Sequence, residues 1–175
     1  METKIMALEL KNISTNKALS EETICYSAKL YWKGQHIAHV GNRGCGGPDE
    51  QTPMPGKRAL LDEAEAYAKS LPAIPSGFEG LPELKMDLEL WCSLRVSDEM
   101  DNKAVLSMLR RDMKKSVLVV KDGGISTFSW KGVKQVEQKH IDAIKAKHPT
   151  LQILNGMPEA AALAIYKPLV LQQPA

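Results

Sequence analysis

The 175-residue chain is predicted to fold as an α+β protein in which antiparallel strand hairpins pack against three to five helices. Two pairs of strand-like segments each enclose a short turn containing glycine, a pattern typical of β-hairpins. Segments with apolar residues at helical spacing lie between and after these hairpins. Because the strands come in pairs and do not alternate singly with helices, we expect antiparallel pairing.

A hairpin in the N-terminal half follows a first strand over residues 4–13 and a polar connector over 14–22. Its strands are predicted at 23–32 and 35–42, around a Lys33-Gly34 turn that sets Trp32 opposite Gln35. Residues three apart in a strand point to opposite faces, so His36 and His39 are expected on different faces. The more apolar face is our choice for the core, and it carries Tyr26, Ala28, Leu30, Trp32, Ile37, His39 and Gly41.

The helices begin with an amphipathic segment over residues 57–71, which Pro72 ends. An irregular connector rich in Pro and Gly follows over 72–83. Residues 84–96 and 101–115 are both helix-like, and Ser97-Asp98 between them either interrupts the helix or faces solvent. The later elements are predicted as a hairpin (116–121 and 125–130), a helix (136–147), a short strand (151–154) and a short helix (158–166).

The length of the chain suits one domain over residues 1–175 that buries a core without metal or disulfide support. The 72–83 connector could divide the chain into two lobes. We prefer one domain, because the residues before this connector would form only a thin core by themselves. Hydrophobic and charged contents of 43% and 25% are ordinary for a globular protein. No apolar run is long enough for a membrane span, and the N-terminus lacks the apolar region of a secretory signal.

Three cysteines at positions 25, 45 and 92 form an odd, scattered set that does not resemble a disulfide framework. We therefore expect a cytoplasmic protein. No cofactor and no metal site are predicted, and the sequence specifies no oligomeric state.

Charge is divided unevenly along the chain. Residues 1–102 hold 11 Lys and Arg against 16 Asp and Glu, a net charge of −5, whereas residues 103–175 hold 12 against 5, a net of +7. This asymmetry indicates an anionic partner for the C-terminal part. The alternative is that the two parts fold together and offset each other's field.

A glycine-rich loop follows the first hairpin and is the first candidate site. A phosphate-binding P-loop is excluded because no Lys-Ser or Lys-Thr follows the glycines, and three prolines separate them from the next helix. A dinucleotide fingerprint is also absent. A looser anion-binding nest that includes Arg43 stays open, and the alternative is a sharp structural turn. The candidate residues are Asn42, Arg43, Gly44, Cys45, Gly46 and Gly47.

Cys45 lies between two glycines and is expected to be accessible. A catalytic thiol needs a base or a helix N-terminus to lower its pKa, and at most one of His36 and His39 could approach it. The same geometry argues against zinc binding by these three residues. The acidic residues of the 57–71 helix lie on its solvated side and form no acid–base pair. We therefore predict that the protein is not an enzyme.

A basic cluster in the C-terminal half is the second candidate site, and Phe128 and Trp130 are interleaved with it. Lysine and arginine neutralise phosphates, and an exposed aromatic ring can stack on a base. The alternative is that these cations complement a helix C-terminus and that the aromatic residues belong to the core. No helix-turn-helix, zinc-finger or ribonucleoprotein motif is present. The cluster consists of Arg110, Arg111, Lys114, Lys115, Lys121, Lys131, Lys134 and Lys139.

Two stretches, "LSEETICYSAKLYWKGQHIAHVGNRGCGGP" (Leu19–Pro48) and "VKQVEQKHIDAIKAKHPTLQILNGMPEAA" (Val133–Ala161), resemble small uncharacterised accessory proteins of phages and prophages. The shared features are a hairpin leading to an Asn-x-Gly-x-Gly-Gly turn and a late ILN…P-E-A segment. The resemblance covers about a third of the chain and implies no catalytic residue. It implies a mobile-element protein that acts by binding a partner in the cytoplasm of the host cell.

The leading functional hypothesis is a non-enzymatic protein that docks on a host protein or nucleoprotein machine, including a defence system that it would modulate. The first alternative is direct binding of nucleic acid through the basic cluster. The second alternative is a site for a small anionic ligand, or a thiol-dependent site, at the glycine-rich loop. No membrane partner is expected.

Overall fold

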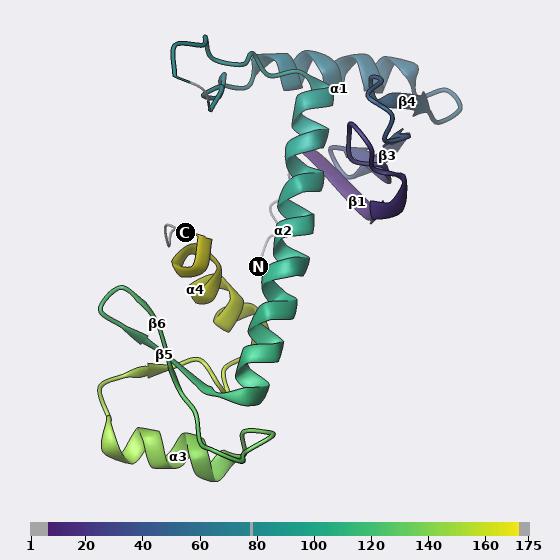
Figure 1. Ribbon diagram of the computed structural model, residues 1–175. Helices are drawn as coiled ribbons and strands as arrows, with labels where there is room; N and C mark the ends of the chain where they lie inside the picture. Colours follow the sequence, from purple (N-terminus) through teal and green to yellow (C-terminus); the bar gives the residue numbers. More distant parts are fainter. Residues whose placement is uncertain (1–6, 78, 172–175) are drawn as a thin grey trace. The chain divides into compact units, whose positions relative to one another are not determined.

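The computed structural model describes residues 7–77 and 79–171, and it confirms the α+β class. Within these residues the chain forms four α-helices and two antiparallel sheets (Figure 1). It divides into two compact units, Met1–Glu99 and Met100–Ala175. The division falls within helix α2 (Leu88–Lys115) and not in the 72–83 connector. The single domain expected over 1–175 stays a prediction, and the two units are described separately here.

The N-terminal unit contains a four-stranded antiparallel sheet in the order β1-β2-β3-β4. The β2–β3 hairpin is confirmed, with Lys33 and Gly34 both at positive φ in the turn, as a two-residue hairpin loop requires. Residues 4–6 of the predicted first strand lie outside the described residues. The strands are β1 (Leu8–Thr15), β2 (Tyr26–Trp32), β3 (Gln35–Asn42) and β4 (Glu50–Pro53), with a short 3-10 helix, η1 (Lys17–Leu19), after β1.

A β-bulge changes the register of this hairpin. Tyr31 pairs with His36 as predicted, but Leu30 pairs with Ala38, so Ile37 is an extra residue on β3. Beyond the bulge, the side chains of β3 are on the opposite faces from those predicted. The assignment of His39 to the core face is therefore wrong, and so is that of Gly41. The buried residues of β3 beyond the bulge are Ala38, Val40 and Asn42.

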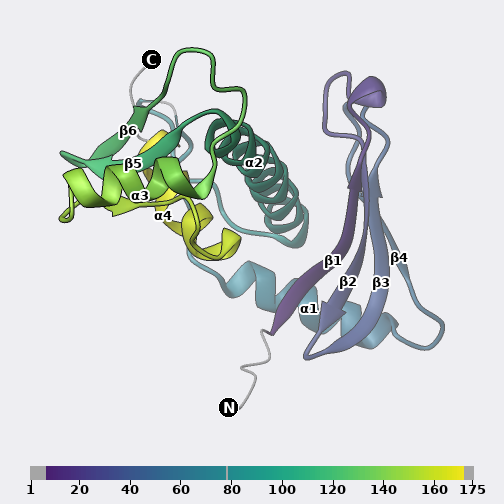
Figure 2. The ribbon, with the colours of Figure 1, turned by 90° about the horizontal axis from the view of Figure 1, so that it is seen from below.

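Helix α1 (Arg58–Ser70) confirms the predicted amphipathic helix and packs on β2 and β3 (Figure 2). The rings of Trp32 and Tyr67 have centroids 5.1 Å apart. The indole N–H of Trp32 donates to Glu63 Oε2 at 3.1 Å, so the buried ring keeps its hydrogen bond. The core is completed by Leu61, Ala64 and Ala68 of α1 and by Leu88, Trp91, Cys92 and Val96 of α2.

The two helical segments predicted at 84–96 and 101–115 belong to one continuous helix, α2, which is 28 residues long and begins only at Leu88. Ser97 and Asp98 are both exposed. Of the two alternatives for this polar pair, the one in which it faces solvent is confirmed.

The C-terminal unit has a three-stranded antiparallel sheet in the order β6-β5-β7. Helices α3 and α4 lie on its opposite faces (Figure 1). Leu118 packs with the α2 and α4 side, whereas Val117 and Val119 pack with α3, as the alternation of a strand requires. The elements are β5 (Val117–Lys121), β6 (Gly124–Phe128), α3 (Gln138–Lys147), β7 (Gln152–Ile153) and α4 (Glu159–Leu171).

Two contacts hold the C-terminal end of α2 in this unit. The buried Asn155 side chain accepts from the Leu118 amide at 2.7 Å and donates to the carbonyls of Met113 and Ser116, each at 3.0 Å. The Val136 amide donates to the Lys114 carbonyl at 2.8 Å. The carbonyls at a helix end lack partners within the helix, and these bonds satisfy those of Met113 and Lys114. They also fix the loop between β6 and α3 against the end of α2.

Candidate functional site

The glycine-rich loop after β3 is organised by Asn42, which the bulge places on the buried face. Its Oδ1 accepts from the Gly44 amide at 2.8 Å and from the Thr23 hydroxyl at 2.7 Å. Its Nδ2 donates to the Gly47 carbonyl at 2.8 Å and to Asp49 Oδ1 at 3.0 Å. One buried amide side chain therefore uses both its donor and its acceptor capacity to close the loop.

Gly44 is the second fixed point of this loop. Its carbonyl accepts from the amides of Glu21, Glu22 and Thr23 at 2.9 to 3.2 Å. Its φ of +90° favours glycine, and an added Cβ would lie 2.0 Å from the Leu19 carbonyl oxygen. These contacts support the interpretation of the segment as a sharp structural turn.

An anion nest would need free amides, and two amides of this loop are already used. The Gly44 amide donates to Asn42, and the Gly46 amide donates to Thr23 Oγ1 at 3.3 Å. Arg43, the cation expected in the nest, forms an exposed ion pair with Glu50 at 2.8 Å. Two amides of the loop and the Arg43 side chain are thus engaged within the protein, and the nest stays a prediction.

Cys45 is exposed, as expected, and lines an open cavity of about 330 Å³. The other lining residues are Asn42, Arg43, Gly47, Pro48 and Glu50, so no histidine faces the thiol there. The cavity therefore lacks the imidazole base that commonly activates a catalytic thiol.

A polar cluster around Tyr26 and Asp49 was not foreseen from the sequence. The Tyr26 hydroxyl donates to Asp49 Oδ2, and the Asp49 amide donates to Glu89 Oε1 at 3.2 Å. Burial raises the pKa of the Tyr26 phenol, and the bond to Asp49 raises it further. The pKa of the Cys92 thiol is raised to about 12, mainly by burial and next by the nearby charge of Asp49. Both groups stay protonated at neutral pH, so neither is poised to act as a nucleophile.

The bulge also assembles a row of rings on the outer face of the sheet. Tyr31 and His36 stack with centroids 5.2 Å apart, and His36 meets His39 edge-on at 4.9 Å. Lys11 Nζ lies 4.5 Å from the Tyr31 centroid. The expectation that His36 and His39 lie on opposite faces is therefore wrong, because the extra residue between them restores a common face.

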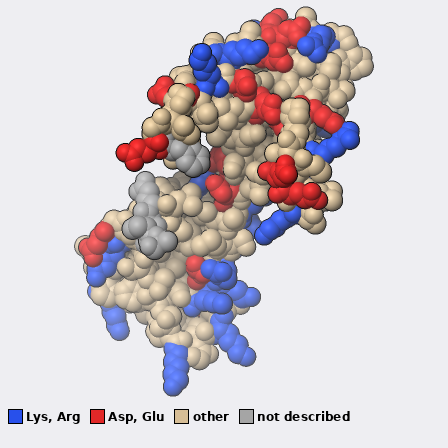
Figure 3. Space-filling model, turned by 45° about the horizontal axis from the view of Figure 1, so that its top comes forward, with Lys and Arg blue, Asp and Glu red and all other residues tan. Residues whose placement is uncertain are grey.

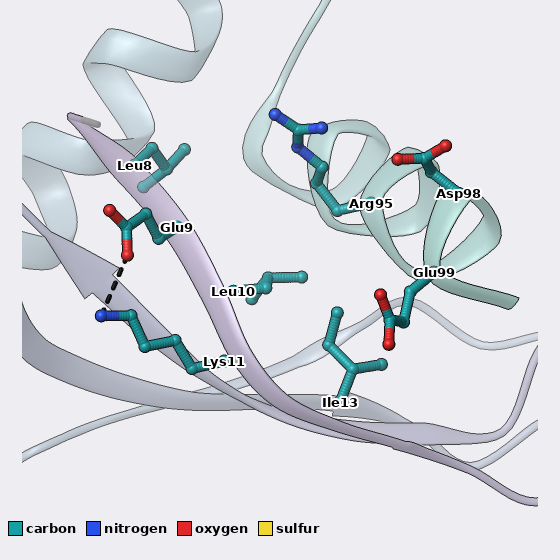
Figure 4. A pocket seen from close by; sticks show the side chains of 8 residues that line it. All are labelled: Leu8, Glu9, Leu10, Lys11, Ile13, Arg95, Asp98 and Glu99. Carbon is teal, nitrogen blue, oxygen red and sulfur yellow. Dashed lines mark ion pairs between the residues drawn. The ribbon is translucent and has the colours of Figure 1, made fainter. Parts of the chain in front are cut away.

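Another cavity, of about 340 Å³, lies between β1 and α2 within the N-terminal unit (Figure 4). Leu10 and Ile13 point into it, whereas Glu9 and Lys11 form an ion pair at 3.0 Å on the other side of the strand. Arg95 lies over the Trp91 ring at 5.6 Å. Asp98 and Glu99 also have interaction partners. The charged groups at this cavity are therefore already engaged.

The predicted basic cluster separates into paired and unpaired cations. Arg110 binds both carboxylate oxygens of Glu159, at 2.6 and 2.7 Å, and these bonds raise the pKa of Arg110 and lower that of Glu159. Arg111 pairs with Asp112 at 3.0 Å. Lys139 pairs with Glu137 at 2.7 Å. The other five lysines of the cluster are exposed, and none forms an ion pair with another described residue: Lys114, Lys115, Lys121, Lys131 and Lys134.

Four of these lysines share one region of the C-terminal unit. Lys114 and Lys115 end α2, and Lys131 and Lys134 lie in the loop that Val136 ties to the Lys114 carbonyl. We call these four residues the lysine surface. Lys121 lies at the other end of β5 and is not brought to it.

The charge around the lysine surface is strongly positive. Residues 100–175 hold 12 Lys and Arg against 6 Asp and Glu, a net of +6. The lower part of Figure 3, which holds this unit, shows Lys and Arg projecting with few acids among them. Lys145 and Lys147 of α3, which the sequence analysis did not single out, are also exposed and without ion pairs among the described residues.

Phe128 and Trp130 were considered either as exposed rings or as core residues, and each has features of both. Both are half-buried and pack against the cluster of Val117, Val119 and Ile144. Phe128 stacks on His148 with centroids 5.4 Å apart, and Trp130 lies against His140 at 4.8 Å. Both also line an open cavity of about 250 Å³.

Comparison with known proteins finds no family model that matches the chain and no significantly similar curated protein or solved structure. Over the described residues, no helix combines the length and apolar character needed to cross a membrane. No group of three or more His, Cys, Asp or Glu in residues 7–77 and 79–171 is arranged to hold a metal ion.

Proposed function

We propose that the protein is a non-enzymatic binding protein whose C-terminal unit docks on nucleic acid, free or within a nucleoprotein machine, through the lysine surface. The observation that carries this proposal is the division between paired and unpaired cations. Arg110 and Arg111 are bound to carboxylates, whereas the four lysines of the lysine surface have no ion-pair partner among the described residues.

Unpaired lysines suit a polyanion for a physical reason. A lysine that neutralises a phosphate releases a condensed counterion, which favours binding at low salt. A cation already bound to a carboxylate must first give up that partner, so it gains less. Four phosphate contacts predict that log K falls with log salt with a slope of about −3 to −4.

The non-enzymatic part of the proposal is supported by the surroundings of two thiols and one phenol. The Cys45 cavity offers no histidine, and the raised pKa values keep Tyr26 and Cys92 protonated. The resemblance to phage accessory proteins supports a partner in the cytoplasm of a host cell. Within that context we propose a host nucleoprotein machine, including a defence complex, as the target.

Fluorescence anisotropy with labelled single- and double-stranded DNA and RNA tests the proposal between about 50 and 200 mM salt. We expect binding that weakens steeply with salt and weakens further in the Lys114→Ala/Lys115→Ala variant. The matched control is Lys69→Ala/Lys85→Ala, which removes two exposed lysines from the N-terminal unit. No binding at the lowest salt, or an equal loss in the control, would overturn it. Binding to an acidic protein instead of nucleic acid would also overturn it.

A further inference from the structure

We propose that the cavity between β6 and α3 holds one base of a single-stranded nucleic acid, stacked against Phe128 and Trp130 with Lys147 at the rim. This inference rests on the proposed function and adds a strand preference to it. The lysine surface contacts phosphates, which both duplex and single strand display, whereas the cavity needs an unstacked base.

The cavity is built from two elements of the C-terminal unit. The end of β6 and the residues after it supply Phe128, Ser129 and Trp130. Helix α3 and its C-cap supply Ala143, Ile144, Lys147 and His148. The contacts of Phe128 with His148 and of Trp130 with His140 fix the orientation of both aromatic rings before any ligand arrives.

The size and the lining of this cavity select the ligand. Its volume of about 250 Å³ is below the roughly 300–1,000 Å³ of pockets that enclose a whole drug-sized molecule, so it suits one planar ring system. Half-buried rings leave part of each aromatic side chain in contact with solvent. Aromatic side chains stack on bases of any sequence, since every base has a π-face.

One lysine lies at the opening. Lys147 lines the cavity, whereas Lys145, two residues earlier on α3, projects from another side of the helix and does not line it. Lys147 forms no ion pair with a described residue. A base in the cavity carries its own phosphate, and Lys147 is placed to neutralise it.

A duplex keeps its bases stacked and paired, so a base enters such a cavity readily only from a single strand. The gain from one stacked base corresponds to roughly 5- to 150-fold tighter binding. We therefore expect single strands to bind tighter than duplexes of equal length by a factor in that range.

Tryptophan fluorescence tests the inference directly, because Trp32 and Trp91 are buried in the other unit and Trp130 is half-exposed. We expect a thymidine oligonucleotide to quench the fluorescence of the full chain, and the quenching to disappear in Trp130→Phe but to persist in Trp91→Phe. Trp130→Phe keeps a ring and should keep the preference for single strands, whereas Phe128→Ala should reduce it. Circular dichroism of each variant identifies any that fail to fold.

The outcomes separate the inference from the proposed function. Equal affinity for both strand forms, without a change in Trp130 fluorescence, would overturn the inference while the lysine surface still binds phosphate. No binding of either form at low salt would overturn both. A free nucleoside monophosphate should quench the fluorescence less than the oligonucleotide does. Equally strong quenching would show that the cavity binds a single nucleotide and not a base of a strand, and it would contradict the inference.

Discussion

Replacing Asn42 by alanine tests whether one buried side chain closes the glycine-rich loop. The substitution removes four hydrogen bonds: those from the Gly44 amide and the Thr23 hydroxyl, and those to the Gly47 carbonyl and the Asp49 carboxylate. The Gly44 amide is buried and donates to no other described residue, so the substitution leaves it unpaired. The other three groups are only partly buried and can turn to water.

The expected loss follows from these environments. A buried donor left without a partner costs about 1–3 kcal/mol, and each bond exchanged for water costs less. We therefore expect Asn42→Ala to lower the free energy of unfolding by about 2–4 kcal/mol. Arg43→Ala is the matched control in the next position, because its exposed ion pair with Glu50 contributes about 0–1 kcal/mol.

Urea unfolding followed by tryptophan fluorescence measures this difference in a Trp130→Phe background. The remaining tryptophans, Trp32 and Trp91, are both buried in the N-terminal unit, so their signal reports its unfolding. An Asn42→Ala variant within about 0.5 kcal/mol of the parent, the range usual for neutral surface changes, would refute the argument that this side chain organises the loop.

Further predictions concern glycines, thiols and pH. Gly44→Ala should lower the free energy of unfolding by about 2 kcal/mol or more, because φ is +90° and the new Cβ meets the Leu19 carbonyl. Gly47→Ala is the control, because a Cβ at Gly47 meets open space and should change the free energy of unfolding little. Urea unfolding compares the two variants. A thiol-reactive dye should label Cys45 at once and Cys92 only after unfolding, and equal labelling rates would contradict the structure. The folded pKa values of Cys92 and Tyr166 are both raised to about 12, so the stability they contribute is full at neutral pH and is lost as pH rises from about 9 towards 12. A midpoint of urea unfolding that stays constant or rises over that range would show that these groups do not remain protonated in the fold.

The hairpins and helices were predictable because their causes are local. The Lys33-Gly34 turn and the helical spacing over 57–71 each specify an element within a few residues. The bulge at Ile37 has no such cause in the sequence, and it reverses the faces of β3 beyond it. The burial of Asn42 and the contact between His36 and His39 both follow from the bulge, so sequence reasoning missed them.

The sequence predicted the charge asymmetry but not which cations are paired with carboxylates. Arg110 looks as available as Lys114 in the sequence, yet its partner Glu159 lies 49 residues away and becomes a neighbour only in the fold. The paired and unpaired cations are thus separable only once α4 is placed against α2. The ILN segment also stood out in the sequence, and Asn155 within it joins α2 to β5.

The central claim is that the lysine surface binds phosphates, and the salt dependence of affinity tests it most directly. Two lost phosphate contacts make the slope of log K against log salt shallower by about 1.4 to 1.8. The account predicts that change for Lys114→Ala/Lys115→Ala and an unchanged slope for Lys69→Ala/Lys85→Ala. An identical slope in both variants, or an affinity that does not respond to salt, would contradict it.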